Sequence, residues 1–199
     1  MQQQKIRCRW SRGNRLYERY HDKEWGVPLY NDKKLFEFLV LEGAQAGLSW
    51  ITVLKKREAY RAAMDRFDFN KIARYTGHKV QSLLKNPGII RNELKIRSTI
   101  SNARAFLEIR KEFGTFARYI WRFVDYKPVQ NNWRSPDKVP TTTALSDEIA
   151  GDLKKRGFSF IGSIIVYSHL QATGVINDHT TDCFRHAEVK KLVRKKPAS

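Results

Sequence analysis

Apolar residues recur every three or four positions along most of this chain, which is the spacing of amphipathic helices. The segment 31–47 shows this well, because one face of a helix there would carry four apolar side chains: Leu35, Phe36, Leu39 and Val40. Asn31 or Asp32 precedes that face, at the position expected for a helix N-cap. Alternation with a period of two, which would indicate β-strands, is not convincing in any part of the sequence.

The same spacing predicts further helices at 49–67, 70–75, 78–85, 89–114, 115–124, 146–157 and 161–174. In the 146–157 segment Ser146 would be the N-cap, acidic residues follow it and Gly157 ends the helix. Prolines between residues 126 and 142 indicate a long loop there. We therefore expect an all-α protein with a single domain over residues 1–187 and a basic, frayed tail at 188–199.

The charge of the chain narrows the choice of partner. Lysine and arginine number 38 against 20 acidic residues, which gives a net charge of +18 and a pI near 10.1. Because these bases are spread over the whole sequence, we expect a polyanionic partner, first of all nucleic acid. A merely well solvated surface is the alternative. A membrane surface is less favoured, because no basic amphipathic helix stands apart from the core pattern.

No part of the sequence predicts a membrane location. No apolar run approaches the roughly 18 residues that a transmembrane helix needs, and the first ten residues lack the apolar segment of a secretory signal. We therefore expect a soluble cytoplasmic protein and a monomer. Thiols stay reduced in the cytoplasm, so a disulfide between Cys8 and Cys183 is not expected.

The chain contains two cysteines, and each lies near a histidine, at opposite ends of the sequence. His21 follows Cys8, and His179 precedes Cys183 by four positions. Cysteine and histidine are the ligands of structural zinc sites, so these four residues could form a Cys2His2 set that joins the two chain ends. Such a site would constrain the unfolded chain and add to the free energy of folding. The alternative is two ordinary buried thiols and two hydrogen-bonded histidines.

A single acid and a group of aromatic residues suggest a ligand pocket. Glu42 ends an apolar run, FLVL, where a solvated carboxylate is not expected. The aromatic residues are Tyr17, Tyr20, Trp25 and Trp50. Ring faces attract a cation and a carboxylate accepts hydrogen bonds from an exocyclic amine, so the set would suit a modified nucleobase flipped out of DNA. The alternatives are a carboxylate bonded to backbone amides at the helix end, and aromatic residues that are plain core.

Several long stretches make the chain resemble a known family: YHDKEWGVP, LEGAQAGLSWITVLKKRE, PGIIRN, NARA, KKRGFSFIG and NDHTTDC. It is similar to the 3-methyladenine DNA glycosylase I family, a zinc-containing branch of the helix-hairpin-helix glycosylases. The resemblance runs from Cys8 to Cys183, which is nearly the whole chain.

The resemblance implies roles for the candidate residues. It implies a structural zinc ion bound by Cys8, His21, His179 and Cys183. It implies a base pocket in which Glu42 is the catalytic residue and the walls are Tyr17, Tyr20, Trp25 and Trp50. It implies DNA contacts at Gly88, Arg91 and Lys95, in and beside a hairpin that binds a phosphate through backbone amides. It also implies a DNA contact at Leu48, in a separate loop that approaches the gap left by the flipped base. For Leu48 the alternative is a buried anchor of its loop.

The resemblance also implies the reaction, which is hydrolysis of the N-glycosidic bond of 3-methyladenine in double-stranded alkylated DNA, without strand cleavage. The sequence has no aspartate between Pro87 and Asp125, in agreement with a branch that lacks the catalytic aspartate of many relatives. The alternatives are a non-catalytic binder of damaged or structured DNA on the same fold, and an RNA-binding zinc protein.

Overall fold

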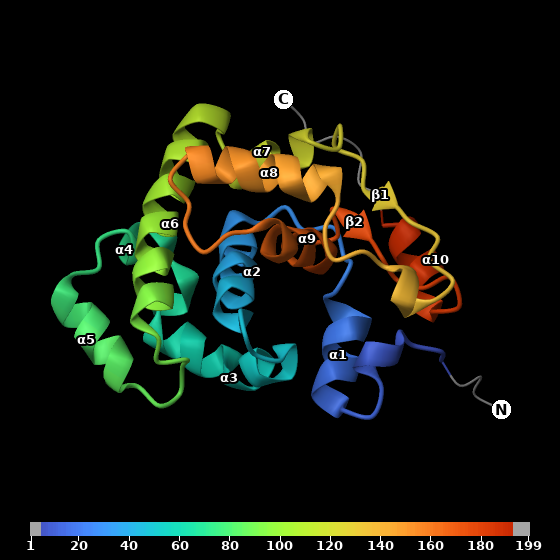
Figure 1. The fold of residues 1–199 in the computed structure, drawn as a ribbon, viewed down its shortest axis with the longest axis horizontal. Helices are drawn as coiled ribbons and strands as arrows, with labels where there is room; N and C mark the ends of the chain where they lie inside the picture. Colours follow the sequence, from blue (N-terminus) through green and yellow to red (C-terminus); the bar gives the residue numbers. More distant parts are fainter. Residues whose placement is uncertain (1–4, 193–199) are drawn as a thin grey trace.

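A computed structural model describes residues 5–192, and helices dominate it (Figure 1). The α-helices are α1 Arg15–Lys23, α2 Asp32–Gln45, α3 Trp50–Ala63, α4 Phe69–Ile72, α5 Gly77–Lys85, α6 Glu93–Phe113, α7 Phe116–Arg122, α8 Ala144–Lys155, α9 Ser163–Ala172 and α10 Phe184–Lys190. Short 3-10 turns are η1 Arg9–Ser11, η2 Asp65–Phe67 and η3 Pro136–Lys138. The expected helical architecture is confirmed.

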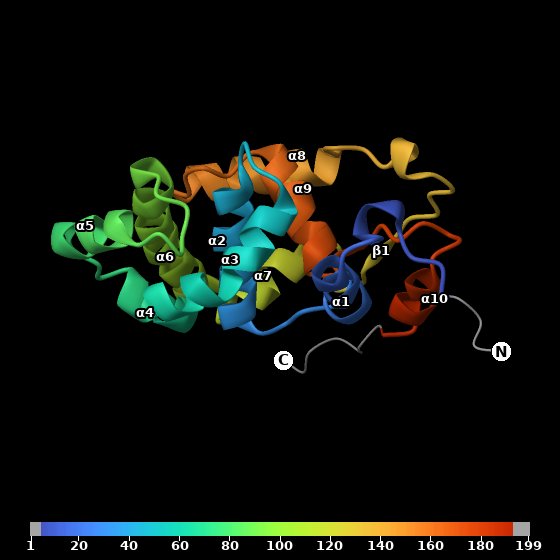
Figure 2. The same cartoon turned by 90° about the horizontal axis from the view of Figure 1, so that it is seen from below.

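Helix α2 lies at the centre of the molecule. It contacts α3, α6, α7 and α9, which surround it in Figures 1 and 2. Its N-cap is Asn31, whose side chain accepts a hydrogen bond from the Lys34 amide at 3.0 Å. The predicted apolar face is buried in the main core, with Leu35 and Phe36 fully buried. The pattern therefore located both the start and the inner face of this helix.

The start of α8 differs from the prediction. The N-cap is Thr143, whose hydroxyl accepts from the Ser146 amide, while the Ser146 hydroxyl accepts from the Thr143 amide. This reciprocal pair is a capping box, in which the expected cap Ser146 is the third helical residue. The prediction of Ser146 as N-cap is wrong because both residues are good capping residues, and the earlier one starts the helix.

The 126–142 segment contains two elements that the sequence did not predict, strand β1 and the 3-10 turn η3. Strand β1, Val129–Gln130, pairs in parallel with β2, Ile176–Asn177, with Val129 opposite Ile176. Each strand has only two residues, so it leaves no alternation in the sequence. The pairing fastens the long loop to the C-terminal part of the chain, and residues of this loop form one wall of the site described below.

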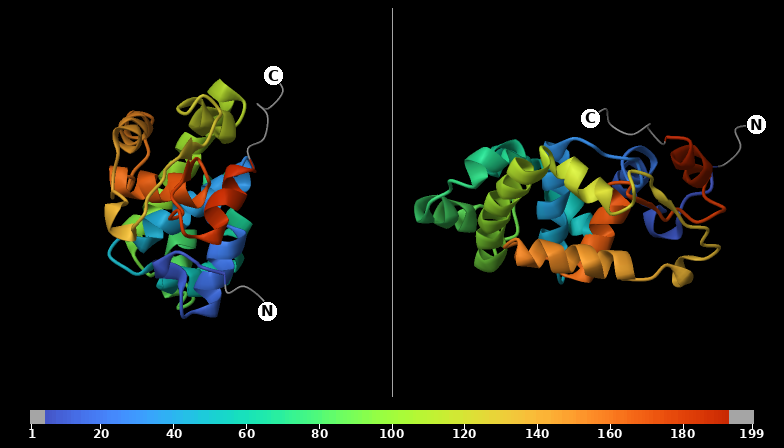
Figure 3. Two further views of the ribbon diagram at one scale, coloured as in Figure 1. Left: turned by 90° about the vertical axis from the view of Figure 1, so that its right-hand side faces the viewer. Right: turned by 90° about the horizontal axis from the view of Figure 1, so that it is seen from above.

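The N-terminal segment and α10 lie side by side, at the right of Figure 1 and facing the viewer in the left view of Figure 3. The amide of Phe184 donates to the Ile6 carbonyl at 3.0 Å, which joins the two segments directly. Helix α10 continues to Lys190, past the domain boundary expected at residue 187, and Val189 within it is buried. The expected tail at 188–199 falls partly outside the described residues, which end at 192.

In the described part of the chain, no helix combines the length and apolar character that crossing a membrane would require.

Candidate functional site

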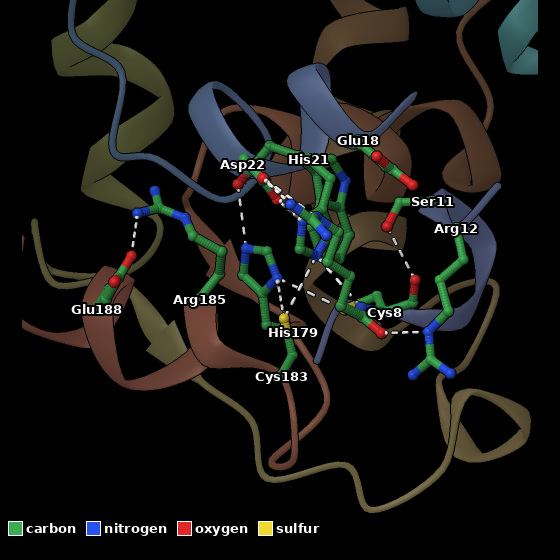
Figure 4. Close-up of polar contacts among 12 residues, drawn as sticks. Cys8, Ser11, Arg12, Glu18, His21, Asp22, His179, Cys183, Arg185 and Glu188 are labelled. Carbon is green, nitrogen blue, oxygen red and sulfur yellow. Dashed lines mark hydrogen bonds and ion pairs between the residues drawn. The ribbon is translucent and has the colours of Figure 1, made fainter. Parts of the chain in front are cut away.

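The structure brings the two Cys/His pairs together in one buried cluster (Figure 4). The potential ligand atoms of Cys8, His21, His179 and Cys183 all lie within 4.8 Å of one another. Cys183 Sγ lies 3.4 Å from His21 Nε2 and 3.5 Å from His179 Nδ1, and Cys8 Sγ lies 3.5 Å from the same His179 nitrogen. The expected cluster is confirmed as a group of residues that could hold a metal ion.

Each histidine is oriented by a hydrogen bond at its outer nitrogen. His21 Nδ1 lies 2.9 Å from Asp22 Oδ1, and His179 Nε2 lies 3.1 Å from the Trp25 carbonyl oxygen. Asp22 is itself held by the Arg7 guanidinium, at 2.8 Å. Outer hydrogen bonds of this kind fix the tautomer of a metal-binding imidazole and leave the other nitrogen free for the metal.

The spacing of the four atoms agrees with a tetrahedral ion. Metal–sulfur and metal–nitrogen bonds of about 2.3 and 2.0 Å at tetrahedral angles place sulfur and nitrogen about 3.5 Å apart. The observed sulfur–nitrogen distances are 3.4 and 3.5 Å. A hydrogen bond from Cys8, followed by those from His179 and His21, lowers the pKa of the Cys183 thiol, while the same bond raises the pKa of Cys8. Cys183 is therefore the cysteine that the protein alone holds as the thiolate.

Beside the cluster lies a cavity of about 350 Å³ that contains every residue expected in the base pocket. The predicted lining residues are Tyr17, Tyr20, Trp25, Glu42 and Trp50. The other lining residues were not expected in the pocket from the sequence: Cys8, Trp10, Gln45, Pro136, Val139, Ser168, Gln171, Asp178 and Thr180. Cys8 belongs both to the cluster and to this lining, so the cluster supports one wall of the cavity.

Glu42 faces this cavity without a protein partner. Its side chain is 5% exposed, and within residues 5–192 no hydrogen bond or ion pair engages its carboxylate. Burial raises the pKa of Glu42 to about 8, because a carboxylate ionises at a cost where water and donors are scarce. The alternative of a carboxylate bonded to backbone amides is therefore wrong. A ligand that brings a positive charge or an N–H donor would relieve this cost.

The raised pKa of Glu42 predicts a pH dependence of stability. The native protein keeps a proton that the unfolded chain releases above pH 4.5, so the stabilising contribution is complete below 4.5 and is lost as the pH rises to about 8. The loss in the free energy of unfolding is on the order of 2–4 kcal/mol. It is smaller than the full pKa shift would give, because the cavity reaches solvent. We expect Glu42→Gln to gain that much over the wild type at pH 8 and little at pH 4.5, as measured by urea unfolding. Equal pH profiles would contradict the prediction.

The walls of the cavity are fixed by contacts between helices. The Tyr17 hydroxyl accepts a hydrogen bond from the Ile51 amide at 2.9 Å, which joins α1 to the first turn of α3. Arg57 of α3 binds Glu24 at 2.7 Å and Glu37 at 2.6 Å, and so connects the end of α1 to α2. Tyr20 of α1 is buried against Trp50, with ring centroids 5.6 Å apart. The aromatic residues pack as core does, but their arrangement also frames the cavity.

Asp178 anchors the opposite wall. Its carboxylate accepts four hydrogen bonds, at 2.5 to 2.7 Å, from Asn131, Trp133, Tyr167 and Gln171. Asn131 and Trp133 lie in the proline-containing loop, so Asp178 fastens that loop and with it Pro136 and Val139 over the cavity. The one available signal was the position of Asp178 beside His179, because an acid next to a metal ligand commonly supports the site. The loop residues themselves carried no signal.

The four predicted DNA contacts lie on two loops and the start of α6. Leu48, between α2 and α3, is 42% exposed, so the alternative of a buried anchor is wrong. Gly88 lies in the 86–92 loop between α5 and α6, where its amide donates to Asn86 Oδ1 at 2.8 Å. A Cβ at Gly88 would come within 2.8 Å of the Ala59 side chain, so the position requires glycine.

The two basic candidates behave differently. Arg91 is exposed in the same loop. Lys95 is only half-buried, but its ammonium donates to the carbonyl oxygens of Ala44 and Ala46, at 2.9 and 2.6 Å. In the 86–92 loop, the Ile90 amide donates a hydrogen bond to the hydroxyl of Tyr60 in α3, at 3.1 Å.

The site thus consists of a buried cluster that could hold a metal ion and joins the chain ends, beside an aromatic cavity with an unpaired carboxylate, in a helical protein. Residues 10–186 match the methyladenine glycosylase family. DNA-3-methyladenine glycosylase 1 of Escherichia coli (strain K12) is 48% identical over 177 residues, which cover 89% of this chain and 95% of that protein. The chain belongs to the methyladenine glycosylase family, and the family and enzyme class expected from the sequence are confirmed.

Other relatives agree with this assignment. DNA-3-methyladenine glycosylase of Haemophilus influenzae is 46% identical over 177 residues, with 89% of this chain and 96% of that one covered. A crystal structure of a 3-methyladenine DNA glycosylase I matches with a TM-score of 0.88 and 52% identity, over 90% of this chain and 98% of that chain. The Staphylococcus aureus enzyme, studied for its recognition of 3-methyladenine, matches with a TM-score of 0.87 and 33% identity, covering 96% and 98%.

Proposed function

We propose that this protein removes 3-methyladenine from double-stranded alkylated DNA, by hydrolysing the bond between the base and its sugar as the first step of base-excision repair. The base would be flipped out of the duplex into the aromatic cavity. The observation that carries this proposal is Glu42, a buried carboxylate that faces the cavity without a protein partner.

The chemistry of the lesion matches what the cavity offers. Methylation at N3 leaves a positive charge on the base, so it departs as a neutral leaving group when water attacks C1′ of the sugar. A strong general acid is then unnecessary, in agreement with a chain that has no aspartate between Pro87 and Asp125. The base needs to be selected and held, and these tasks fall to the cavity residues.

Glu42 would accept a hydrogen bond from the base, and the rings of Tyr20 and Trp50 would stack on it, with Tyr17 and Trp25 completing the wall. A cationic base would favour the ionised form of Glu42, whose pKa burial has raised to about 8. Neutral adenine would lose the cation–π attraction, about 0.5–2 kcal/mol, and the charge-assisted hydrogen bond, about 1.5–3 kcal/mol. Together these terms correspond to discrimination of roughly a hundredfold or more.

Zinc is the metal that the cluster fits best. Two thiolates and two imidazoles at tetrahedral spacing are a common structural zinc set, and four protein ligands leave no position open for substrate. Cys8, His21, His179 and Cys183 would hold the ion. It would stabilise the fold around the cavity and take no part in the reaction.

The DNA would lie across the loops that carry the exposed candidates. The 86–92 loop with its two flanking helices would serve as the helix-hairpin-helix element, with Gly88 allowing close packing and Arg91 contacting a phosphate. Leu48, exposed on the loop before α3, would approach the gap that the flipped base leaves. The net charge of +18 would supply the general attraction to DNA.

No lysine in the sequence is marked out as a nucleophile, so we propose a monofunctional enzyme. We also propose that it is a monomer and that it acts in the cytoplasm.

The test is the release of free base from methylated duplex DNA, separated by chromatography. We expect 3-methyladenine as the product and an intact sugar–phosphate backbone. Retention of the DNA without release of any base would favour the non-catalytic binder of damaged DNA. Preference for RNA over duplex DNA would favour the RNA-binding protein. Release of 3-methylguanine or bulkier bases would widen the range of substrates within the same function.

A further inference from the structure

Lys95 forms a contact that a surface lysine directed at DNA does not need. It lies in the first turn of α6, and its ammonium donates to two backbone carbonyls at the end of α2, those of Ala44 and Ala46. The last carbonyls of a helix lack intrahelical partners and carry the negative end of the helix dipole, so an ammonium there satisfies and stabilises them. Lys95 therefore caps α2 from a different helix.

The capped end of α2 carries the site. Glu42 lies within the last turn, and the chain then passes through Gly47 to the exposed Leu48. The Leu48 amide donates back to the Gln45 carbonyl at 2.6 Å, so the loop continues from the turn that Lys95 holds. A shift of these carbonyls would move Leu48 and Glu42 together.

The backbone of Lys95 is bonded to the 86–92 loop. The Lys95 amide donates to Asn92 Oδ1 at 3.1 Å, and Asn92 is the N-cap residue that ends this loop and begins α6. Arg91 and Gly88 are on the same loop. One residue thus connects the loop expected to contact a phosphate with the helix end expected to meet the flipped base.

We propose that Lys95 is a positioning residue, which couples the DNA-anchored 86–92 loop to Leu48 and Glu42 instead of neutralising a phosphate. This inference rests on the proposed function. It assigns to Lys95 a role different from the direct DNA contact expected from the sequence. Burial lowers the pKa of Lys95, in agreement with an ammonium drawn partly out of solvent onto the protein.

The experiment compares Lys95→Met with Arg91→Met, Lys95→Arg and Lys111→Met. Lys111 is a suitable control because it is exposed, has the same charge and lies near the opposite end of α6, about 24 Å along the helix. Three quantities are measured: the single-turnover rate of base release at saturating DNA, the slope of log affinity against log salt, and hydrogen exchange at residues 45–49 in the free protein. Circular dichroism melting checks that each variant is folded.

For Lys95→Met we expect a rate lowered about 10- to 100-fold, because small misplacements of reacting groups cost that much, with an unchanged salt slope. Hydrogen exchange at residues 45–49 should rise in this variant. Lys95→Arg should restore most of the rate, since its guanidinium can donate to both carbonyls. Arg91→Met should reduce the salt slope by about 1, as loss of a phosphate contact does. Lys111→Met should match the wild type.

A salt slope reduced by about 1 in Lys95→Met, with a normal rate at saturating DNA, would overturn the proposal in favour of a direct phosphate contact. An unchanged rate, slope and exchange would also overturn it. Hydrogen exchange is measured without DNA, so it tests the contact of Lys95 with the end of α2 even if the wild type releases no base. Absence of base release from the wild type would separately refute the proposed function.

Discussion

Replacing Glu42 by Gln should lower the release of 3-methyladenine from methylated duplex DNA by about 10- to 150-fold, the equivalent of the 1.5–3 kcal/mol carried by a charge-assisted hydrogen bond. The substitution keeps the size of the side chain and removes its charge. Because Glu42 makes no hydrogen bond or ion pair within residues 5–192, the change breaks no contact of the fold. The loss should therefore appear in the single-turnover rate and leave the melting temperature unreduced.

A second glutamate makes the comparison specific. Glu93 is exposed at the start of α6 and pairs with Arg97, so Glu93→Gln makes the same chemical substitution without touching the cavity. This control should release base at close to the wild-type rate. Full activity of Glu42→Gln would remove Glu42 from the mechanism while leaving the proposed reaction intact. Absence of release even from the wild type would refute the reaction itself.

Replacing Cys183 by Ala should lower zinc content and stability together. Three ligands bind the ion far more weakly than four, and the binding free energy of a structural metal adds directly to folding free energy. We expect a loss of several kcal/mol, which in a domain of this size lowers the melting temperature by about 10 °C or more. Excision should fall as well, because Cys8 lines the cavity and His179 contacts the Trp25 carbonyl.

The control for Cys183→Ala is His186→Ala. His186 lies three residues further on and its ring bonds to the Asn131 carbonyl, outside the four-residue cluster. That variant should keep one zinc per chain, measured by atomic emission, and lose only the small contribution of one hydrogen bond. A zinc-free Cys183→Ala protein with an unchanged melting curve would show that the cluster is not needed for stability.

The helices could be predicted because their signals are local. The apolar face of α2 and the cap at Asn31 are both visible within a few residues of sequence, and the structure confirms them. The failures involve choices between similar local signals or contacts between distant segments. Thr143 and Ser146 are both capping residues, and their reciprocal bonds decide which starts α8. Strand β1 exists only because β2 lies beside it.

The candidate site follows the same division. Glu42 stands out in the sequence because an acid ends an apolar run, and the two Cys/His pairs stand out because the chain contains only two cysteines. The family resemblance then joined these separate signals. The wall around Asp178 could not be predicted, because its four donors come from two segments that meet only in the folded protein. The contact of Lys95 with the end of α2 could not be predicted either, because α2 and α6 meet only in the folded protein. In a basic sequence, a lysine is more readily interpreted as a phosphate ligand.

The joining of the chain ends sets an order on the synthesis of this protein. His21 and Cys183 are 162 positions apart in sequence but lie 3.4 Å apart in the cluster. The segment that carries Cys8, Tyr17 and Tyr20 leaves the ribosome well before the part of the cluster around residue 183 is translated. The central helices can form a core while synthesis continues, and α1 can pack on α3 through Tyr17 and Ile51, but the Cys/His cluster that supports the cavity is complete only after translation has passed Cys183. A ribosome that stalls earlier would hold a partly folded chain with neither a complete metal site nor a complete pocket.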